Sequence, residues 1–406
     1  MQQVVSDKKQ FEKAILPAIV FAQFFCTSVW FAGNAVIFEL VKEQELDRFF
    51  LAHLTSAIQL GFITGTLFFA VFSIADRFSP SRVFFASALC AACCNLGISI
   101  QELPETGILV SRLLTGFFLA GIYPVGMKIA SDHYKEGLGK SLGFLVGALV
   151  IGTALPHLLK QFLFLINWRY VVYGTSILSI AGGIIIQLCV PDGQYRKAGQ
   201  KIKLTSFLKG FENRNFRIAA LGYFGHMWEL YTFWAFVPVI ITTYNHLHPT
   251  VNLPVAILSF LVIASGGLAC VISGSLANKF GAKNLATISL VISCACCLLS
   301  PILLVTANSV LAIGFLFLWG MTVISDSPLF STLIATHAPA TSKGASLTIV
   351  NCIGFSITIL SLQAINFAAT IVPSQYLYML LAIGPLIGII ALLNRTGNRQ
   401  QESEMI

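Results

Sequence analysis

Four of the ionisable side chains inside otherwise apolar stretches of this sequence could carry chemistry. His226 and Glu229 lie three residues apart in one stretch, whereas Asp326 and Arg112 lie in two others. A charge inside a membrane span is costly and therefore marks a functional site by default. These residue types could carry protons or hold a charged solute. The alternative is structural, either an ion pair between helices or a hydrogen bond that fixes their packing.

The spacing of His226 and Glu229 places both side chains on one face of a helix. Glu229 follows Arg217 by 12 residues. That separation is about 18 Å along a helix, near the middle of a membrane core about 30 Å thick. We interpret Glu229 as the principal proton-coupling candidate, with His226 and Asp326 as further candidates. Arg112 is a candidate anchor for an anion, or a partner for a carboxylate.

Several other side chains near these charges are candidates for substrate contact. Aromatic residues on a membrane helix commonly face lipid or a neighbouring helix, which is the alternative for each of them. The candidates are Trp30, Asn34, Tyr231 and Trp234.

The composition requires lipid as the solvent. The 406 residues are 56% hydrophobic and only 10% charged, with a mean hydropathy of +0.82. A soluble domain carries about 25% charged residues. The ten cysteines lie within apolar runs, so they indicate packing thiols rather than a metal site or a disulfide framework. Nucleophile-elbow, zinc-helix and phosphate-loop motifs are absent, so we expect neither an enzyme nor a cofactor.

Twelve apolar runs are long enough to cross a membrane as helices. They are 14–38, 50–75, 83–101, 106–130, 138–160, 169–190, 217–244, 254–278, 284–306, 309–336, 344–370 and 375–394.

Basic residues fix the expected orientation. If the N-terminus is cytoplasmic, 20 of the 25 Lys and Arg residues fall on the cytoplasmic side. Positive charge is enriched in cytoplasmic loops, so both termini are expected in the cytoplasm and the protein in the inner membrane. The net charge of +8 is therefore read as a topology signal, and no nucleic-acid partner is expected.

One polar, basic segment divides the chain. We expect an N-terminal six-helix bundle in 1–190, a cytoplasmic linker in 191–216 and a C-terminal six-helix bundle in 217–406. The basic run of the linker is suited to a surface of anionic lipid headgroups.

The two halves also repeat one another at an offset of about 204 residues. Each half has an even number of spans, so the repeats are parallel and related by an axis along the membrane normal. This predicts an all-α membrane protein with twelve transmembrane helices in two pseudo-symmetric six-helix bundles. A substrate site is expected at mid-membrane between them. Matching pairs include Trp30 with Trp234, Gly116 with Gly320, and Pro124 with Pro328.

The charges break this symmetry. Glu229 corresponds to Phe25, His226 to Ala22, Asp326 to Ile122 and Arg112 to Leu316. A charge needed only for the architecture would be expected in both halves. The asymmetry therefore favours a role in handling protons or substrate.

Residues 73–82 resemble the loop signature of the major facilitator superfamily, Gly-x-x-x-Asp-Arg-x-Gly-Arg-Arg/Lys, with Phe72 and Ser79 in place of its glycines. The second half has a similar segment that begins at Gly274. The resemblance implies a gating loop in which Asp76 caps a neighbouring helix or pairs with a basic residue across the two halves. The alternative is a helix cap with topology charges. The gating-loop candidates are Asp76, Arg77, Arg82, Asn278, Lys279 and Lys283.

Two further segments resemble the same superfamily. Arg112-x-x-x-Gly116 is similar to its fourth-span signature, and Trp168-Arg169 to the element that often opens its sixth span. The segment from His226 to Trp234 is similar to small bacterial members grouped with cyanate and nitrate/nitrite porters. The Gly-rich signature of nitrate carriers in the fifth and eleventh spans is missing.

Together these features predict a monomeric secondary transporter in the lipid bilayer that uses alternating access and protons, for example as a symporter. Arg112 and His226 favour a small organic or inorganic anion as the substrate. The abundance of Phe and a buried acid favour the alternative, a proton-driven exporter of drugs or other amphipathic cations.

Overall fold

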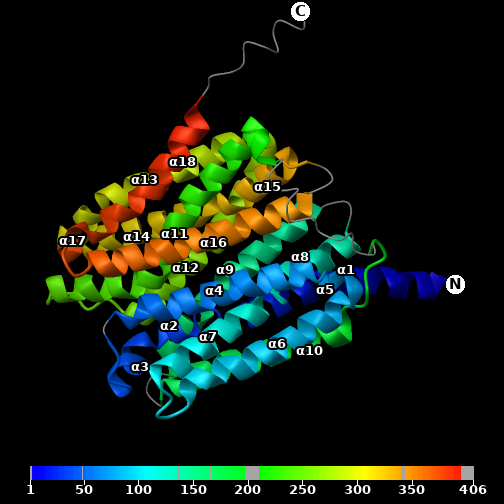
Figure 1. Ribbon diagram of the computed structural model, residues 1–406, viewed down its shortest axis with the longest axis horizontal. Coiled ribbons are helices and arrows are strands. Elements are labelled where there is room, and N and C mark those ends of the chain that lie inside the picture. Colours follow the sequence, from blue (N-terminus) through cyan, green and yellow to red (C-terminus); the bar gives the residue numbers. More distant parts are fainter. Residues whose placement is uncertain are drawn as a thin grey trace, which may run out of the picture.

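The computed structural model describes residues 2–47, 49–134, 138–163, 167–196, 210–339 and 343–394, with side chains described from residue 14 onward except 138–140. These residues form helices and no strands, arranged as two bundles (Figure 1). The all-α prediction is confirmed.

The first bundle contains six spans, several of which are divided into consecutive helices. Its elements are α1 (Gln2–Thr27), α2 (Ala32–Ala35), α3 (Ile37–Glu43), α4 (Phe50–Val71), α5 (Ile74–Arg77), α6 (Pro80–Leu96), η1 (Gly97–Ser99), α7 (Glu105–Leu119), α8 (Tyr123–His133), α9 (Leu138–Leu163) and α10 (Arg169–Cys189).

The second bundle repeats this plan. Its elements are α11 (Arg214–Leu247), α12 (Val255–Phe280), α13 (Ala282–Val305), α14 (Ser309–Ser325), α15 (Ser327–His337), α16 (Lys343–Ala368), α17 (Ser374–Leu377), η3 (Tyr378–Ala382) and α18 (Ile383–Leu393).

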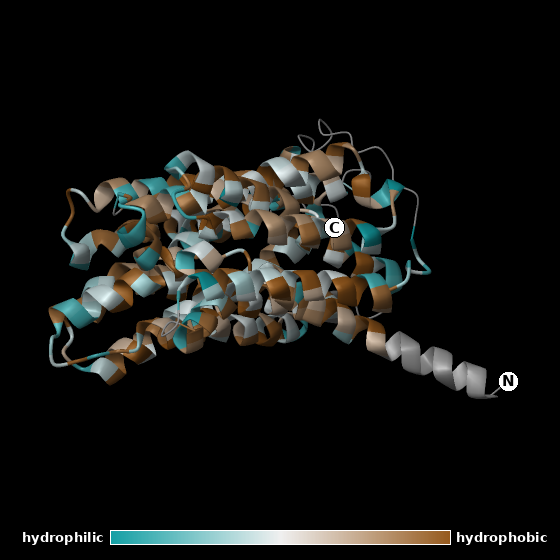
Figure 2. Cartoon of the chain, turned by 90° about the horizontal axis from the view of Figure 1, so that it is seen from below, coloured by the Kyte–Doolittle hydropathy of each residue, from teal (hydrophilic) through white to brown (hydrophobic). Residues whose placement is uncertain are grey.

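Each of the twelve predicted runs coincides with a helix or with consecutive helices. Within the described chain, ten spans are long and apolar enough to cross a membrane, and Ala14–Thr27 is a shorter apolar helix. The remaining run lies in α11, a helix of 34 residues that carries His226 and Glu229. Figure 2 shows the most hydrophilic segments gathered towards the two ends of the bundles.

Glycines let equivalent helices approach closely in both halves. A Cβ atom at Gly116 of α7 would overlap the carbonyl oxygen of Ile58 in α4, and one at Gly320 of α14 would overlap that of Val262 in α12. Gly320 and Val262 each follow their counterparts Gly116 and Ile58 by 204 residues, so the repeat in the sequence is also a repeat of helix contacts. Small residues at such crossings allow backbones to pack directly.

Among the described residues, the first, fourth and tenth spans are interrupted partway along their length. The fourth span is interrupted at 120–122 and the tenth at Asp326, and Pro124 and Pro328 lie in the first turn of the helix that follows each break. The first span is interrupted at 28–31, whereas the equivalent part of α11 continues unbroken. The sequence did not predict the break in the first span, which contains no proline at that point.

In the described chain, the most extensive contacts between the bundles join two pairs of helices. The helix α4 packs against α16, and α9 packs against α12. The amide of Gln363 donates to the hydroxyl of Ser56 at 2.9 Å across the first of these contacts. Of the predicted linker, residues 197–209 lie outside the described residues, and α11 begins at Arg214.

Candidate functional site

Glu229 lies within the second bundle and is only 1% exposed. Its carboxyl accepts a hydrogen bond from Nε1 of Trp319 at 2.6 Å, one from the thiol of Cys297 at 3.2 Å, and one from the hydroxyl of Ser293. These donors come from α13 and α14. All three are uncharged, and no cation in the described chain lies within ion-pair distance of Glu229. Glu229 therefore faces the interior of its own bundle rather than the interface between bundles.

His226 and Asp326 form the second polar contact of this bundle. Nδ1 of His226 lies 2.8 Å from Oδ1 of Asp326, and both side chains are buried. Asp326 occupies the break between α14 and α15, so the interruption of the tenth span brings its carboxyl to α11. The break therefore contains a buried polar contact.

His226 and Glu229 lie on one face of α11, as their spacing predicted. Both side chains point from α11 towards the helices α13 to α15, but they have different partners. The structure therefore contains two separate polar contacts one helical turn apart, rather than one cluster. Asp326 belongs to the contact of His226.

Arg112 serves the broken first span. Its guanidinium donates to the carbonyl oxygen of Val29 at 3.2 Å, to the carbonyl oxygen of Trp30, and to Oδ1 of Asn95 at 3.0 Å. The side chain is completely buried. The break leaves carbonyl groups without helical partners, and buried backbone groups must be satisfied. In the second half α11 stays helical at the equivalent position, so no carbonyl groups need a donor there. This explains why the residue equivalent to Arg112 can be an apolar one, Leu316.

Aromatic side chains from both halves meet at the interface between the bundles. We call this group the central aromatic cluster. The ring of Trp30 stacks on Tyr231 at 5.7 Å and on Phe355 at 5.9 Å, and Phe62 lies 4.7 Å from Phe355. The members are Trp30, Phe31, Phe62, Tyr231, Trp234 and Phe355.

The predicted substrate contacts Trp30, Tyr231 and Trp234 thus lie together. Trp234 packs 5.3 Å from Tyr231, and all three are buried. Asn34 lies four residues after Trp30, in α2, and donates to the hydroxyl of Thr55 at 2.7 Å. Arg112 lies in the first bundle, where its guanidinium donates to the backbone carbonyl oxygens of Val29 and Trp30.

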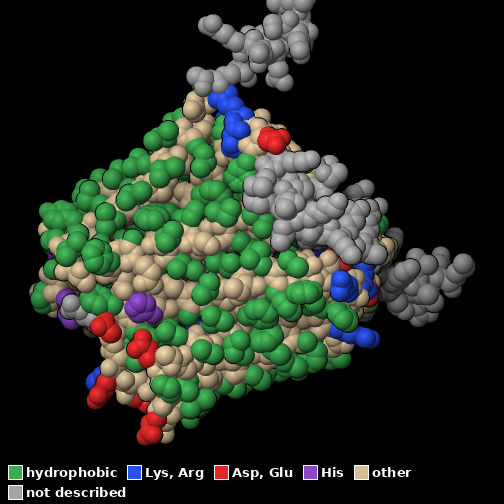
Figure 3. Space-filling view, viewed as in Figure 1, with side chains coloured by type: hydrophobic (Ala, Val, Ile, Leu, Met, Phe, Trp, Pro, Cys, Tyr) green, Lys and Arg blue, Asp and Glu red, His purple; other side chains and the backbone are tan. Residues whose placement is uncertain are grey.

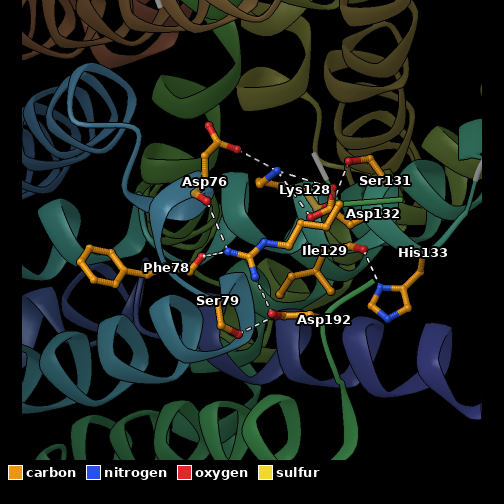
Figure 4. A network of polar contacts seen from close by, with 10 residues as sticks. Asp76, Phe78, Ser79, Lys128, Ile129, Ser131, Asp132, His133 and Asp192 are labelled. Atoms are coloured by element: carbon orange, nitrogen blue, oxygen red, sulfur yellow. Dashed lines mark hydrogen bonds and ion pairs between the residues drawn. The ribbon is translucent and has the colours of Figure 1, made fainter. Parts of the chain in front are cut away.

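The gating-loop candidate Asp76 pairs with Lys128 of α8, at 2.9 Å. Lys128 also lies 3.4 Å from Asp132 (Figure 4). All three residues belong to the first bundle. Among the described residues Asp76 therefore pairs within its own half rather than across the two halves, and its gating role stays a prediction.

The start of the linker is tied to the same loop. Arg196 donates to the carbonyl oxygens of Phe78 at 2.8 Å and Asp76 at 3.3 Å, and it pairs with Asp192 (Figure 4). The hydroxyl of Ser79 also donates to Asp192, at 2.6 Å. The linker thus begins as a strap across the ends of α5 and α6.

The other gating-loop candidates are placed at the surface. Arg77 and Arg82 are exposed in the first half, as are Asn278, Lys279 and Lys283 in the second. The ammonium group of Lys279 lies 5.3 Å from the ring of Phe280. In the second half α12 continues through this segment and turns at Gly281, which adopts a φ of 82° that favours glycine.

The opposite end of the first bundle is fastened by ion pairs. Glu39 pairs with Lys160 at 2.8 Å, and Glu43 pairs with Arg169 at 2.5 Å. Nε1 of Trp168 also donates to Glu43, at 2.6 Å. Hydrogen bonds from Arg169 and Trp168 hold the pKa of Glu43 below its ordinary value of 4.5. Acidic side chains gather at this end, near α3, and basic ones at the opposite side (Figure 3).

Several residues in or near these contacts were not among the predicted candidates. Asn95, which binds Arg112, and Gln59, which lies on α4, are uncharged amides within apolar runs. Their polarity in such runs was a signal that could have been used. Ser293, Cys297 and Trp319 carried no comparable signal, because each is ordinary in a membrane helix.

The described residues contain no group of three or more His, Cys, Asp or Glu side chains that could hold a metal ion. No curated protein matches the chain significantly. A family model described as Major Facilitator Superfamily matches residues 18–362, more than four-fifths of the sequence. The match begins within α1 and ends within α16, so it includes the loop at Asp76 and both breaks next to prolines. The chain therefore belongs to the major facilitator superfamily and is a multi-pass membrane transporter of the secondary type, not an enzyme.

Proposed function

We propose that the protein couples movement of a small solute to protons by alternating access, with Glu229 as the principal proton-carrying group. The observation that carries this proposal is the setting of Glu229, a buried carboxyl with three neutral hydrogen-bond donors. A carboxylate without a counter-ion is costly in an apolar medium, and a proton removes that cost. A change in water access to the second bundle would then change whether the proton is held.

His226 and Asp326 form the secondary proton-handling pair of this proposal. Their contact spans α11 and the break between α14 and α15, so a movement at the break changes the 2.8 Å separation directly. The first half has apolar residues, Ala22 and Ile122, at the equivalent positions. This one-sidedness suits a transporter in which the second bundle handles protons.

The substrate site of the proposal is the central aromatic cluster. The cluster joins the two bundles, where a rocking motion gives access from either side of the membrane. A monomer contains every residue of this site. We place both termini in the cytoplasm and the protein in the inner membrane, because basic residues gather on one side and acidic residues on the other (Figure 3). The loop at Asp76, with its strap of linker residues, would control the cytoplasmic side.

Transport in proteoliposomes tests the coupling. The substrate is taken from a metabolite and drug library by thermal stabilisation of the purified protein. Glu229→Gln should abolish uptake driven by a pH gradient while exchange of labelled for unlabelled solute continues. Glu105→Gln, which changes an exposed glutamate at the start of α7, serves as the matched control. Normal gradient-driven uptake by Glu229→Gln would refute the role of Glu229.

A further inference from the structure

Polar atoms at the central aromatic cluster lack partners in the protein. Nε1 of Trp30 and of Trp234, Oδ1 of Asn34, and both amide atoms of Gln59 have no hydrogen-bond partner among the described residues. All four side chains are at most 1% exposed. They come from the first, second and seventh spans, so three helices present unsatisfied polar atoms to one region.

The position of Gln59 within α4 ties it to this region. Thr55, one turn before it, accepts the hydrogen bond of Asn34. Phe62, on the next turn, lies 4.8 Å from Trp30. Side chains at these spacings share one face of a helix. Gln59 therefore lies on the face of α4 that meets Trp30 and Asn34.

Such groups are costly to keep. A buried donor or acceptor that lacks a partner costs about 1–3 kcal/mol of stability. Five atoms of this kind at one place indicate that the region is built to bind something that completes their hydrogen bonds. Two indole N–H groups offer donors, Asn34 offers an acceptor, and an amide such as that of Gln59 offers a donor and an acceptor side by side.

The ionisable side chains near the region already have hydrogen-bond or contact partners within the protein. Arg112 binds two backbone carbonyls and Asn95, Glu229 accepts from three neutral donors, and His226 contacts Asp326. The five unpartnered atoms at the cluster all belong to neutral side chains, whereas the guanidinium of Arg112, whose Nε also lacks a partner, is bound to the carbonyl groups of the first span. Burying a solute charge without a counter-ion costs several kcal/mol. An uncharged solute avoids that cost.

We propose that the central aromatic cluster binds a flat, uncharged aromatic or heteroaromatic solute that carries a hydrogen-bond donor and acceptor next to each other. The inference rests on the proposed function only in taking this cluster as the substrate site. Trp30 and Phe62 come from the first bundle, and Tyr231 and Phe355 from the second. Separation of the bundles parts these rings, and a flat solute replaces their mutual stacking with its own. The edge of the solute meets the Gln59 amide in the paired geometry by which glutamine reads adenine.

Three compounds of one shape and different charge test this assignment. The probes are 2-naphthamide, which is neutral, 2-naphthamidine, which is a cation, and 2-naphthoate, which is an anion. Thermal stabilisation of the purified protein is measured against each compound without a proton gradient, so failure of proton coupling does not affect the result. We expect saturable stabilisation by 2-naphthamide alone. Stabilisation by 2-naphthoate or 2-naphthamidine instead, or by none of the three, overturns the proposal.

Variants at Gln59 give the second readout. Gln59→Leu should weaken 2-naphthamide binding at least tenfold, which corresponds to about 1.4 kcal/mol. Gln363→Leu is the matched control, because Gln363 lies on the same helix interface but has a partner in Ser56. Gln59→Glu should transfer the preference to 2-naphthamidine. Equal binding of 2-naphthamide by the wild type and Gln59→Leu overturns the proposal.

The stability of the ligand-free variants separates binding from structure. An amide that lacks hydrogen-bond partners lowers the stability of the ligand-free protein. The Gln59→Leu variant should therefore melt at the same temperature as the wild type or higher. An amide that fixes helix packing would behave in the opposite way. A lower melting temperature for Gln59→Leu than for Gln363→Leu therefore counts against the proposal.

Discussion

Nδ1 of His226 lies 2.8 Å from Oδ1 of Asp326, at the residue where the tenth span is broken. The fourth span is broken at the equivalent residue, Ile122, and Ala22 stands where His226 would be. The break therefore forms without a histidine–aspartate pair. The pair is present only in the second half. Replacing its two residues with the equivalent residues of the first half therefore separates the effect of the pair on stability from its effect on function.

Replacing the pair with the first-half residues should cost less than breaking it. His226→Ala leaves a buried carboxyl without its partner and should destabilise the protein by about 3–5 kcal/mol. The double variant His226→Ala/Asp326→Ile removes both polar groups and should be more stable than His226→Ala alone. Chemical unfolding in detergent measures both, with Asp326→Ile completing the cycle. Strictly additive effects would mean that the two side chains do not interact.

The number of spans and the twofold repeat of this fold could be predicted, because the apolar composition and the internal sequence repeat indicate them directly. The twelve runs and the offset between Gly116 and Gly320 require only a chain that must satisfy its backbone in lipid. The break in the first span was not predictable in this way. Trp30 and Trp234 are equivalent in the sequence, yet only the chain near Trp30 leaves the helix, and its carbonyl groups are held by an arginine 82 residues away.

The partners of the candidate site residues were harder to predict than the residues themselves. Asp76 had several basic residues within reach of its end of the bundle, and only the fold selects Lys128. Gln59 carries no charge and was therefore not among the predicted site residues. An uncharged amide gives a weaker signal in an apolar run, although in lipid it is nearly as informative once its partners are known.

Arg112 should be essential for the stability of the fold, because of the geometry of its hydrogen bonds and not only because of its positive charge. Arg112→Leu would leave the carbonyl groups of Val29 and Trp30 buried without donors, at about 1–3 kcal/mol each. Arg112→Lys should recover little, because an ammonium group cannot reproduce the fork geometry of a guanidinium. Thermal unfolding in detergent measures the loss, and Arg82→Leu, an exposed arginine of the same bundle, is the control. A fully stable Arg112→Lys variant would contradict this account.

The contact between Asp76 and Lys128 should matter little for stability. About one quarter of each side chain is exposed, at 25% and 24% respectively. Exposed ion pairs contribute about 0.2–1 kcal/mol. A double-mutant cycle with Asp76→Asn and Lys128→Gln should give a coupling energy in that range, with Arg77→Gln as a neighbouring control. A much larger coupling would show that the pair holds more than its own loop.

Glu43 should make the stability of the first bundle depend on acid. Its pKa is lowered in the folded protein, so its contribution is complete above the ordinary carboxyl value of 4.5 and is lost as the pH falls through the lowered value. The wild type should therefore lose more stability than Glu43→Gln when the pH falls from 6 to 3. Melting curves across this range measure the difference. Parallel pH profiles for the two proteins would rule out a contribution from Glu43.

The glycine contacts predict opposite results for substitutions in one helix. In α14, a Cβ at Gly320 would overlap the carbonyl oxygen of Val262, whereas a Cβ at Gly314 would have no atom within 4 Å. Gly320→Ala must push α14 away from α12 and should destabilise the bundle, by about 1–3 kcal/mol for an overpacked contact. Gly314→Ala meets open space and should stabilise the helix by about 0.5–1 kcal/mol, the helical preference of alanine over glycine. Gly116→Ala should behave like Gly320→Ala, because Ile58 occupies the place of Val262. Unfolding of the three variants in detergent checks the order, and a stable Gly320→Ala variant would show that the two helices can separate without cost.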